Sequence, residues 1–294
     1  MSKKFHGIIP AVLTPFNTKE ELDIESLLEI IDFLVSSKIH GMFILGSTGQ
    51  GLIMGTKDRK QVAENIIEHT NNNIASIIHI GSNNIEDVIE LGKHAIDIKS
   101  DAIACVTPHY YKYDEEAMFE YYKKISSVLD IPIFLYNIPQ YTGYDISIEL
   151  MRKLSDLPNI IGIKDSNVDF SKQLQIIKEL GDDLILLTGT NEKIDSALIN
   201  GIPGCVPSIS NVFPKTCVKI HDSIQNKNIR EAKYLQEKIN SIIKYYSKTV
   251  VIATLLETLR IKGLKSGYVK KPLRNLNNKE INELREILEK SELT

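Results

Sequence analysis

The sequence predicts an α/β protein built as a closed (β/α)8 (TIM) barrel with a C-terminal helical appendix. Short apolar or β-branched runs recur at roughly 20- to 33-residue intervals, with helical periodicity between them. After the eighth run, helical patterns follow one another without a strand. Continuous apolar strands that alternate with helices favour a parallel sheet covered on both faces, and eight such units match a closed barrel. A doubly wound open sheet is the alternative, and it suits fewer strands.

The predicted strands are placed by their apolar runs, and the helices by their periodicity. In residues 23–39, one helical face would carry Leu27, Leu28, Ile31, Leu34 and Val35. The strands begin near Ile8 (IIPAVLT), Gly41 (GMFIL), Ile74 (IASIIHI), Ala102 (AIACV), Ile131 (IPIFLY), Ile160 (IGIK), Leu184 (LILLT) and Gly204 (GCVP).

The character of the chain changes after residue 225. Residues 226–246, 250–264 and 278–292 each have a helical pattern, with Asn278 as the expected N-cap of the last helix and 267–273 as the loop before it. No long linker separates these helices from the barrel. We therefore expect a catalytic barrel domain over residues 1–225 and a helical region over 226–294 that packs on it.

Composition excludes several classes of protein. Of 294 residues, 43% are hydrophobic and 25% charged, and the net charge of −3 argues against a broad nucleic-acid-binding surface. No uncharged apolar run approaches the ~20 residues of a membrane span. Three widely spaced cysteines (Cys105, Cys205, Cys217) form no CxxC pair, and the opening MSKKFHG has no apolar stretch behind it. These features are typical of a soluble cytoplasmic protein without a membrane partner.

Lys164 is the most informative single residue. It ends the apolar run of residues 159–163. A lysine that leaves a buried strand loses solvation of its ammonium form, so its pKa falls and its neutral amine can attack a carbonyl to form a Schiff base. Considered alone, the residue also fits a strand-end lysine that points into water.

Other chemistry-bearing residues follow the predicted strands at the carboxyl face of the barrel, where such folds place their active sites. The glycine-rich loop 46–51 offers backbone N–H groups and two hydroxyls that suit a carboxylate, although a tight turn would also explain it. Tyr136 can carry protons beside an amine, or it can be a core aromatic. The seven histidines show no HxH or HExxH spacing, so no metal site is indicated. The acidic run 114–116 is expected to charge the start of a helix.

Three motifs together resemble a known family. Gly46-Ser47-Thr48-Gly49, Tyr136-Asn137-Ile138-Pro139 and Gly162-Ile163-Lys164 stand at separations similar to those in the dihydrodipicolinate synthase/N-acetylneuraminate lyase family of class I pyruvate aldolases. The resemblance spans essentially the whole chain, from the segment 7–16 to the Pro272-Leu273 loop, and the family's fold is also a barrel.

The resemblance implies roles for individual residues. Lys164 would form the Schiff base with pyruvate, Tyr136 would relay protons, and Ser47 and Thr48 would hold the carboxylate, with Gly49 as a further substrate-binding residue. Tyr110 matches a tyrosine that reaches into a neighbouring subunit's site, which implies a dimer or, more usually, a homotetramer. Gly189 and Val206 match positions whose backbone lines the pocket, and no metal or organic cofactor is implied.

Departures from the family pattern point to the substrate. Dihydrodipicolinate synthases usually carry an arginine where this chain has Tyr141, and a tyrosine cannot form a bidentate carboxylate pair. Gln50 replaces a common glutamate. Lys164-Asp165-Ser166 is similar to the pattern of 2-keto-3-deoxygluconate aldolases. Sialate lyases pair an Asp and a Glu near strand seven; here only Glu192 is present, although Ser208 also fits that group.

We therefore expect an aldolase that reversibly cleaves a 2-keto-3-deoxy sugar acid of the 2-keto-3-deoxygluconate type to pyruvate and a hydroxyaldehyde. Dihydrodipicolinate synthase, which condenses pyruvate with aspartate semialdehyde, and N-acetylneuraminate lyase are the alternatives. A keto-acid sensor without turnover is a different class, against which the combination of Lys164 and Tyr136 argues, since binding alone needs no proton relay.

Overall fold

The computed structural model describes residues 4–291 and 293. Its eight strands are all parallel, and neighbours pair in the order β1-β8-β7-β6-β5-β4-β3-β2. The ring closes between β1 and β2, where the Val12 N–H donates to the Phe43 carbonyl and the Phe43 N–H donates to the Pro10 carbonyl, both at 2.9 Å. The predicted (β/α)8 barrel is confirmed, and the open sheet is excluded.

Each predicted strand forms where its apolar run lies, because both faces of a barrel strand are buried. The strands are β1 (Gly7–Ile8), β2 (Gly41–Ile44), β3 (Ala75–His79), β4 (Ala102–Val106), β5 (Ile133–Asn137), β6 (Ile160–Asp165), β7 (Ile185–Thr188) and β8 (Gly204–Cys205).

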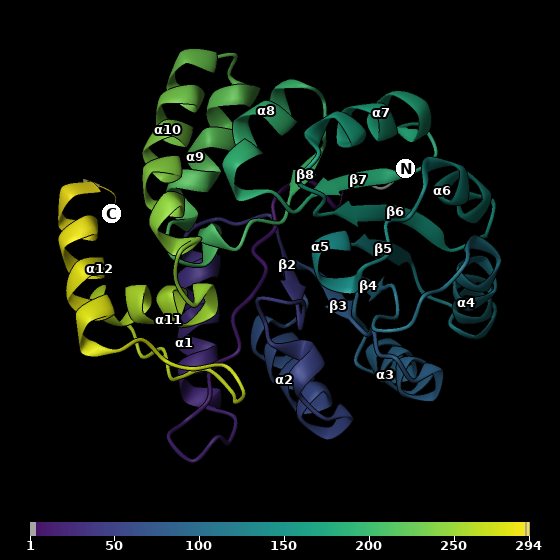
Figure 1. The fold of residues 1–294 in the computed structure, drawn as a ribbon, viewed down its shortest axis with the longest axis horizontal. Helices are drawn as coiled ribbons and strands as arrows, with labels where there is room; N and C mark the ends of the chain where they lie inside the picture. The colour runs from purple at the N-terminus through teal and green to yellow at the C-terminus, as the bar shows by residue number, and fades with distance from the viewer. Residues whose placement is uncertain (1–3, 292, 294) are drawn as a thin grey trace.

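Helices alternate with the strands and surround them (Figure 1). They are α1 (Ile24–Ser36), α2 (Thr56–Thr70), α3 (Ile85–Asp97), α4 (Glu115–Val128), α5 (Pro139–Thr142), α6 (Ile148–Ser155), α7 (Phe170–Leu180), α8 (Ile194–Ile199) and α9 (Pro214–Gln225), with short 3-10 turns η1 (Gly51–Ile53), η2 (Asn191–Lys193) and η3 (Ile209–Asn211).

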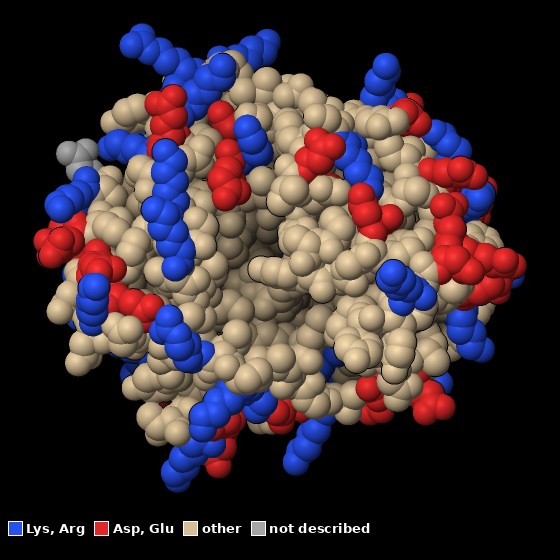
Figure 2. Space-filling model, in the orientation of Figure 1, with Lys and Arg blue, Asp and Glu red and all other residues tan. Residues whose placement is uncertain are grey.

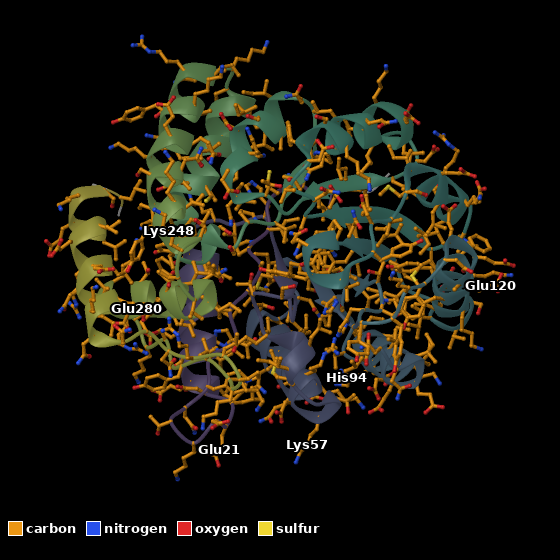
Figure 3. The ribbon with its side chains drawn as sticks, in the orientation of Figure 1. Glu21, Lys57, His94, Glu120, Lys248 and Glu280 are labelled. Carbon is orange, nitrogen blue, oxygen red and sulfur yellow. The ribbon has the colours of Figure 1, made fainter. Side chains whose placement is uncertain are left out.

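Polar residues start several of these helices and charged residues cover their outer faces. Asp114 caps α4 by accepting from the Ala117 N–H, so the acidic run 114–116 does begin a helix. Lys57 on α2 and Glu120 on α4 point away from the barrel (Figure 3). The expected apolar face of α1 is only partly covered: Leu27, Ile31 and Leu34 are buried, whereas Val35 at its edge is 42% exposed.

Within the part of the chain that the structure describes, three further helices follow the barrel: α10 (Ile229–Tyr246), α11 (Val251–Ile261) and α12 (Asn278–Ser291). Figure 1 shows α10 beside α9, with α12 on the outer side. The expected N-cap Asn278 is wrong by one position. Asn277 accepts from the Glu280 N–H at 3.0 Å, and Glu280 accepts from the Asn277 N–H at 2.8 Å, a reciprocal capping box. Whether 226–294 is a separate domain stays a prediction.

The interior of the barrel combines large and small side chains. Phe43, Phe134 and Tyr136 fill it together with small residues such as Ala102 and Gly162, the latter paired with Phe134 on the neighbouring strand. A Cβ on Gly162 would lie 2.5 Å from the Phe134 ring, so the glycine makes room for that ring. Lys164 follows on the same face of β6, two residues later, and therefore points into the barrel. Within the described residues, no helix is both long and apolar enough to cross a lipid bilayer.

Candidate active site

A cavity of about 470 Å³ opens at the carboxyl ends of the strands. Figure 2 looks onto this face and shows a hollow near its centre, walled mostly by uncharged residues. Its lining comes from the ends of β5 to β8, the loop after β2 and helix α11. This is the face on which barrel enzymes carry their chemistry.

Lys164 lies at the base of this cavity with a side chain that is almost entirely buried. Its Nζ stands 3.9 Å from the centre of the Phe43 ring and 4.2 Å from that of Tyr136. Burial disfavours the charged ammonium and lowers the pKa of Lys164 to about 7. A substantial fraction of this amine is therefore neutral at physiological pH.

Tyr136 is the neighbour of Lys164 across the sheet, since the register pairs the two residues directly. Its hydroxyl lies 3.2 Å from the Ser47 Oγ. Burial raises the pKa of Tyr136 to about 12, although hydrogen bonds with Ser47 and Ser166 oppose this shift. The resting phenol is therefore protonated and ready to donate.

Two glycines leave room for the side chains that line the cavity near Lys164. A Cβ on Gly189 would lie 1.9 Å from the Ser166 Oγ, and a Cβ on Gly46 would lie 2.8 Å from the Phe43 ring and 3.9 Å from the Lys164 Nζ. Side chains at either position would displace groups that surround the amine. The glycines are therefore part of the cavity's shape.

The outer part of the cavity carries amide and hydroxyl groups and one carboxyl group, all able to form hydrogen bonds. The Asn191 Nδ2 and Ser208 Oγ are 3.1 Å apart, and Thr190 and Glu192 stand beside them in the wall. Asn191 is held in place because its Oδ1 accepts from the Ile209 N–H at 3.1 Å. Such a rim suits a ligand that carries several hydroxyl groups.

Residues 4–291 match the sequence profile of the Dihydrodipicolinate synthetase family, which is nearly the full length of the chain. The chain belongs to this family. Its general class of activity is that of a pyruvate-dependent lyase. This follows from membership of the family and from relatives that are themselves named lyases.

Individual relatives agree with this family assignment. The chain is 30% identical over 287 residues to an N-acetylneuraminate lyase of Citrobacter koseri, covering 97% of this chain and 96% of the relative. Among solved structures, YagE from E. coli K12, in complex with pyruvate, has a TM-score of 0.95 at 27% identity, with 99% of each chain covered. CdNal from Clostridium difficile, in complex with mannosamine, has a TM-score of 0.93 at 28% identity, covering 97% of this chain and 99% of the other.

The structure brings most of the expected site residues of this family member into one cavity. Those in the lining are Ser47, Thr48, Tyr136, Tyr141, Lys164, Gly189, Glu192, Val206 and Ser208. Gly49 is not in the lining, and a Cβ there would lie 2.8 Å from the Val12 carbonyl oxygen. Tyr110 is also outside it: the residue is 87% exposed and its backbone φ is +82°.

Several cavity residues were missed by sequence reasoning. Ser166 is one of them. It could have been found by the reasoning that identified Lys164, because it lies two residues later and therefore on the same face of the chain. Ser247, Val251 and Ile252 come from the helical appendix, and no local pattern marks them as part of a site. Gln50, which replaces a common family glutamate, has a structural role: its amide donates to the Thr14 carbonyl at 2.7 Å and accepts from the Lys270 N–H at 2.8 Å.

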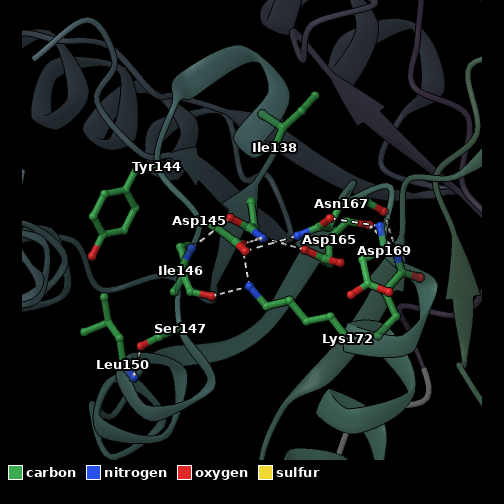
Figure 4. Close-up of polar contacts among 12 residues, drawn as sticks. Ile138, Tyr144, Asp145, Ile146, Ser147, Leu150, Asp165, Asn167, Asp169 and Lys172 are labelled. Atoms are coloured by element: carbon green, nitrogen blue, oxygen red, sulfur yellow. Dashed lines mark hydrogen bonds and ion pairs between the residues drawn. The ribbon is translucent and has the colours of Figure 1, made fainter. Parts of the chain in front are cut away.

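Behind the cavity, a buried polar network joins the ends of the two strands that carry Tyr136 and Lys164 (Figure 4). The Asn137 Nδ2 donates to Asp165 at 2.6 Å and to Asp145 at 2.8 Å, while its Oδ1 accepts from the Ile146 N–H at 3.1 Å. Burial raises the pKa of Asp165 to about 6, and the Asn137 hydrogen bond opposes that shift. Asn137 thereby connects the carboxyl end of β5 to that of β6 and holds the two strand ends in a fixed relative position.

Asn137→Ala is expected to lower the free energy of unfolding by roughly 2 to 4 kcal/mol, because the Ile146 N–H and the Asp165 carboxylate would both lose a buried partner. Urea unfolding at pH 8 measures this change. Asn65→Ala is the matched control, since its amide donates to the exposed Gln61 carbonyl one turn earlier in the same helix. A loss below about 1 kcal/mol in Asn137→Ala would contradict the structural role.

Proposed function

We propose that this chain cleaves a 2-keto-3-deoxy sugar acid reversibly to pyruvate and a hydroxyaldehyde, through a Schiff base on Lys164. The observation that carries the proposal is the buried amine in the cavity, whose pKa is lowered to about 7 by desolvation. A neutral lysine is a nucleophile toward a keto group, and the iminium it forms can accept electrons from a breaking C–C bond.

The proposed reaction follows from the placement of these groups. The Lys164 amine adds to the C2 carbonyl, and loss of water from the carbinolamine gives the iminium. The C3–C4 bond then breaks, its electron pair forms the enamine, and the C4 hydroxyl loses its proton as it becomes the aldehyde. Protonation of the enamine at C3 and hydrolysis release pyruvate. Tyr136, linked to Ser47, is the proton carrier for these steps.

The carboxylate of the keto acid has a binding place in the loop after β2. Ser47 and Thr48 line the cavity, and among the described residues no acceptor lies within hydrogen-bond reach of either backbone N–H. Two N–H groups and two hydroxyls at one turn suit an anion. Fixing the carboxylate there would hold C2 beside Lys164 and lower the entropic cost of reaction.

The remaining part of the substrate is proposed to be polyhydroxylated. Of the described residues that line the cavity, Lys164 is the single cation, and Tyr141 at the mouth is neutral. An aldehyde with its own carboxylate, such as aspartate semialdehyde, would therefore lack a charged partner. The amide and hydroxyl groups of Thr190, Asn191 and Ser208 match hydroxyl groups instead.

A second candidate, N-acetylneuraminate, is favoured by the similarity to N-acetylneuraminate lyases. It is itself a 2-keto-3-deoxy sugar acid, so the two candidates differ in the length of the substrate beyond C4. Pyruvate release from 2-keto-3-deoxygluconate and from N-acetylneuraminate, measured side by side, separates them. Consumption of aspartate semialdehyde with pyruvate, faster than cleavage of either sugar acid, would overturn the proposed substrate class.

We further propose that the active form is a homo-oligomer, with the homotetramer as the expected state. Tyr110 supports this assembly, because an aromatic residue that is 87% exposed beside the exposed Tyr111 is typical of a protein contact. Light scattering of the purified chain tests the assembly, and a monomer at micromolar concentration would contradict it.

The rate of Schiff base formation is expected to rise with pH through about 7 and then to level off. Below that pH, Lys164 gains a proton and loses its nucleophilic lone pair; above it, the amine is neutral. Initial rates of pyruvate-dependent borohydride trapping, measured from pH 5 to 9, test this dependence. A flat profile down to pH 5 would show that a free amine is not required.

A further inference from the structure

Three histidines that are far apart in the sequence meet at the amino-terminal end of the barrel, the end opposite the cavity. His6 precedes β1, His40 precedes β2, and His221 lies on α9. Their ring centres are 5.2 Å (His6–His40), 6.2 Å (His6–His221) and 4.4 Å (His40–His221) apart. One nitrogen from each ring lies within 4.8 Å of the others.

We propose that His6, His40 and His221 bind one divalent cation of the Zn²⁺ class. Tetrahedral coordination at Zn–N distances of about 2.0–2.1 Å would place the three ring centres about 5 Å from one another. The observed separations lie on both sides of that value, so small ring movements complete the geometry. Imidazole nitrogens suit Zn²⁺, Ni²⁺ or Cu²⁺, whereas Mg²⁺ and Ca²⁺ prefer oxygen ligands.

Two further features of the cluster support a cation site. The His221 Nδ1 lies 3.1 Å from a carboxylate oxygen of Asp222, so an N–H donated there leaves Nε2 with a free lone pair. A carboxylate in this position orients a metal-binding imidazole and increases its basicity. His221 is buried, His40 is half-buried and His6 is exposed. The exposed side provides an entry path and room for water as the fourth ligand.

Binding of a cation at His40 would break one hydrogen bond of the free protein. Its Nδ1 accepts from the Ile8 N–H at 3.1 Å, so its Nε2 carries the proton in the free protein. Coordination through Nε2 moves the ring proton to Nδ1 and breaks the bond from Ile8. Gly7 allows the ring its position, since a Cβ there would lie 2.5 Å from the His40 Cγ. We therefore expect weaker binding than at a zinc-finger site, where no hydrogen bond is given up.

The cation would have a structural role. It would join the entries of β1 and β2, where the ring of strands closes, to helix α9. In barrels of this kind the amino-terminal face contributes stability and the opposite face the chemistry. The site is therefore independent of Lys164 and of the proposed lyase reaction, and the two proposals can fail separately.

The test uses the full chain without a histidine tag, freed of metal by a chelator and titrated with Co²⁺. We expect one equivalent to bind with the intense visible absorption of four-coordinate Co²⁺, to be displaced by Zn²⁺, and to raise the thermal midpoint. His6→Ala, at an exposed position that cannot disturb the core, should weaken binding about tenfold or more. His221→Ala should do the same, provided its circular dichroism shows it folded.

His94→Ala is the matched control. Its ring also pairs with a carboxylate, that of Glu64 at 2.7 Å, but it lies outside the cluster, so Co²⁺ binding should equal that of wild type. Absence of the absorption band in wild type, equal binding in His6→Ala, or loss of binding in His94→Ala would each overturn the proposal. Sugar-acid cleavage should be unchanged in His6→Ala, which separates this site from the catalytic one.

Discussion

Lys164→Ala is expected to abolish pyruvate-dependent borohydride trapping and to lower kcat/KM for sugar-acid cleavage by about 10³-fold or more. The alanine removes the only nucleophile that the proposed mechanism uses, and with it the iminium that accepts the electrons of the C3–C4 bond. Mass spectrometry of the trapped protein and a pyruvate-release assay measure the two effects. The fold should persist, because a buried amine is costly and its removal leaves no paired charge behind.

Lys262→Ala is the matched control for this experiment. Lys262 is a second partly buried lysine, with its Nζ 4.3 Å from the centre of the Phe213 ring, and burial lowers its pKa to about 8. It is not part of the cavity lining, so trapping and turnover should remain near wild type. If Lys164→Ala still traps pyruvate, or if Lys262→Ala loses trapping, the assignment of the Schiff base to Lys164 is wrong.

The barrel could be predicted because each of its strands carries a local signal. The run of residues 160–163 is apolar on both faces, and the chain between such runs is periodic at helical spacing. Exposure near helix edges was harder to predict. Val35 has the spacing of a buried residue on α1, yet it is exposed, because the width of the covered stripe depends on how the neighbouring helices sit.

The base of the site could also be predicted, since parallel strands bring their carboxyl ends together. Lys164, Tyr136 and Ser47 meet for this reason. The contribution of α11 could not be predicted, because Val251 and Ile252 reach the cavity only through the packing of the appendix. The histidine cluster could not be predicted either. His40 lies 34 positions after His6, and His221 lies 181 positions after His40 (40 − 6 and 221 − 40), so no local sequence pattern indicates that the three meet.

Tyr136→Phe is expected to lower kcat by about 10² to 10⁴-fold, with the KM for pyruvate in the reverse reaction nearly unchanged. The ring would stay in place against Phe43, whose centre is 5.5 Å away, so the cavity keeps its shape. What is lost is the hydroxyl beside the Ser47 Oγ, and with it the proton carrier for the carbinolamine and for the C4 oxygen. Because the resting phenol has its pKa raised to about 12, it acts first as a donor.

Borohydride trapping measures Schiff base formation separately from C–C cleavage, the two steps in which Tyr136 is proposed to act. If it carries protons, Schiff base formation and C–C cleavage should both slow in Tyr136→Phe, while the trapped adduct still accumulates on Lys164 at long times. Tyr122→Phe is the control: its buried hydroxyl donates to the Cys105 carbonyl at 3.0 Å outside the cavity, so its loss should cost about 1 kcal/mol of stability and leave kcat unchanged. Wild-type turnover in Tyr136→Phe would remove this tyrosine from the mechanism and leave water as the proton carrier at Lys164.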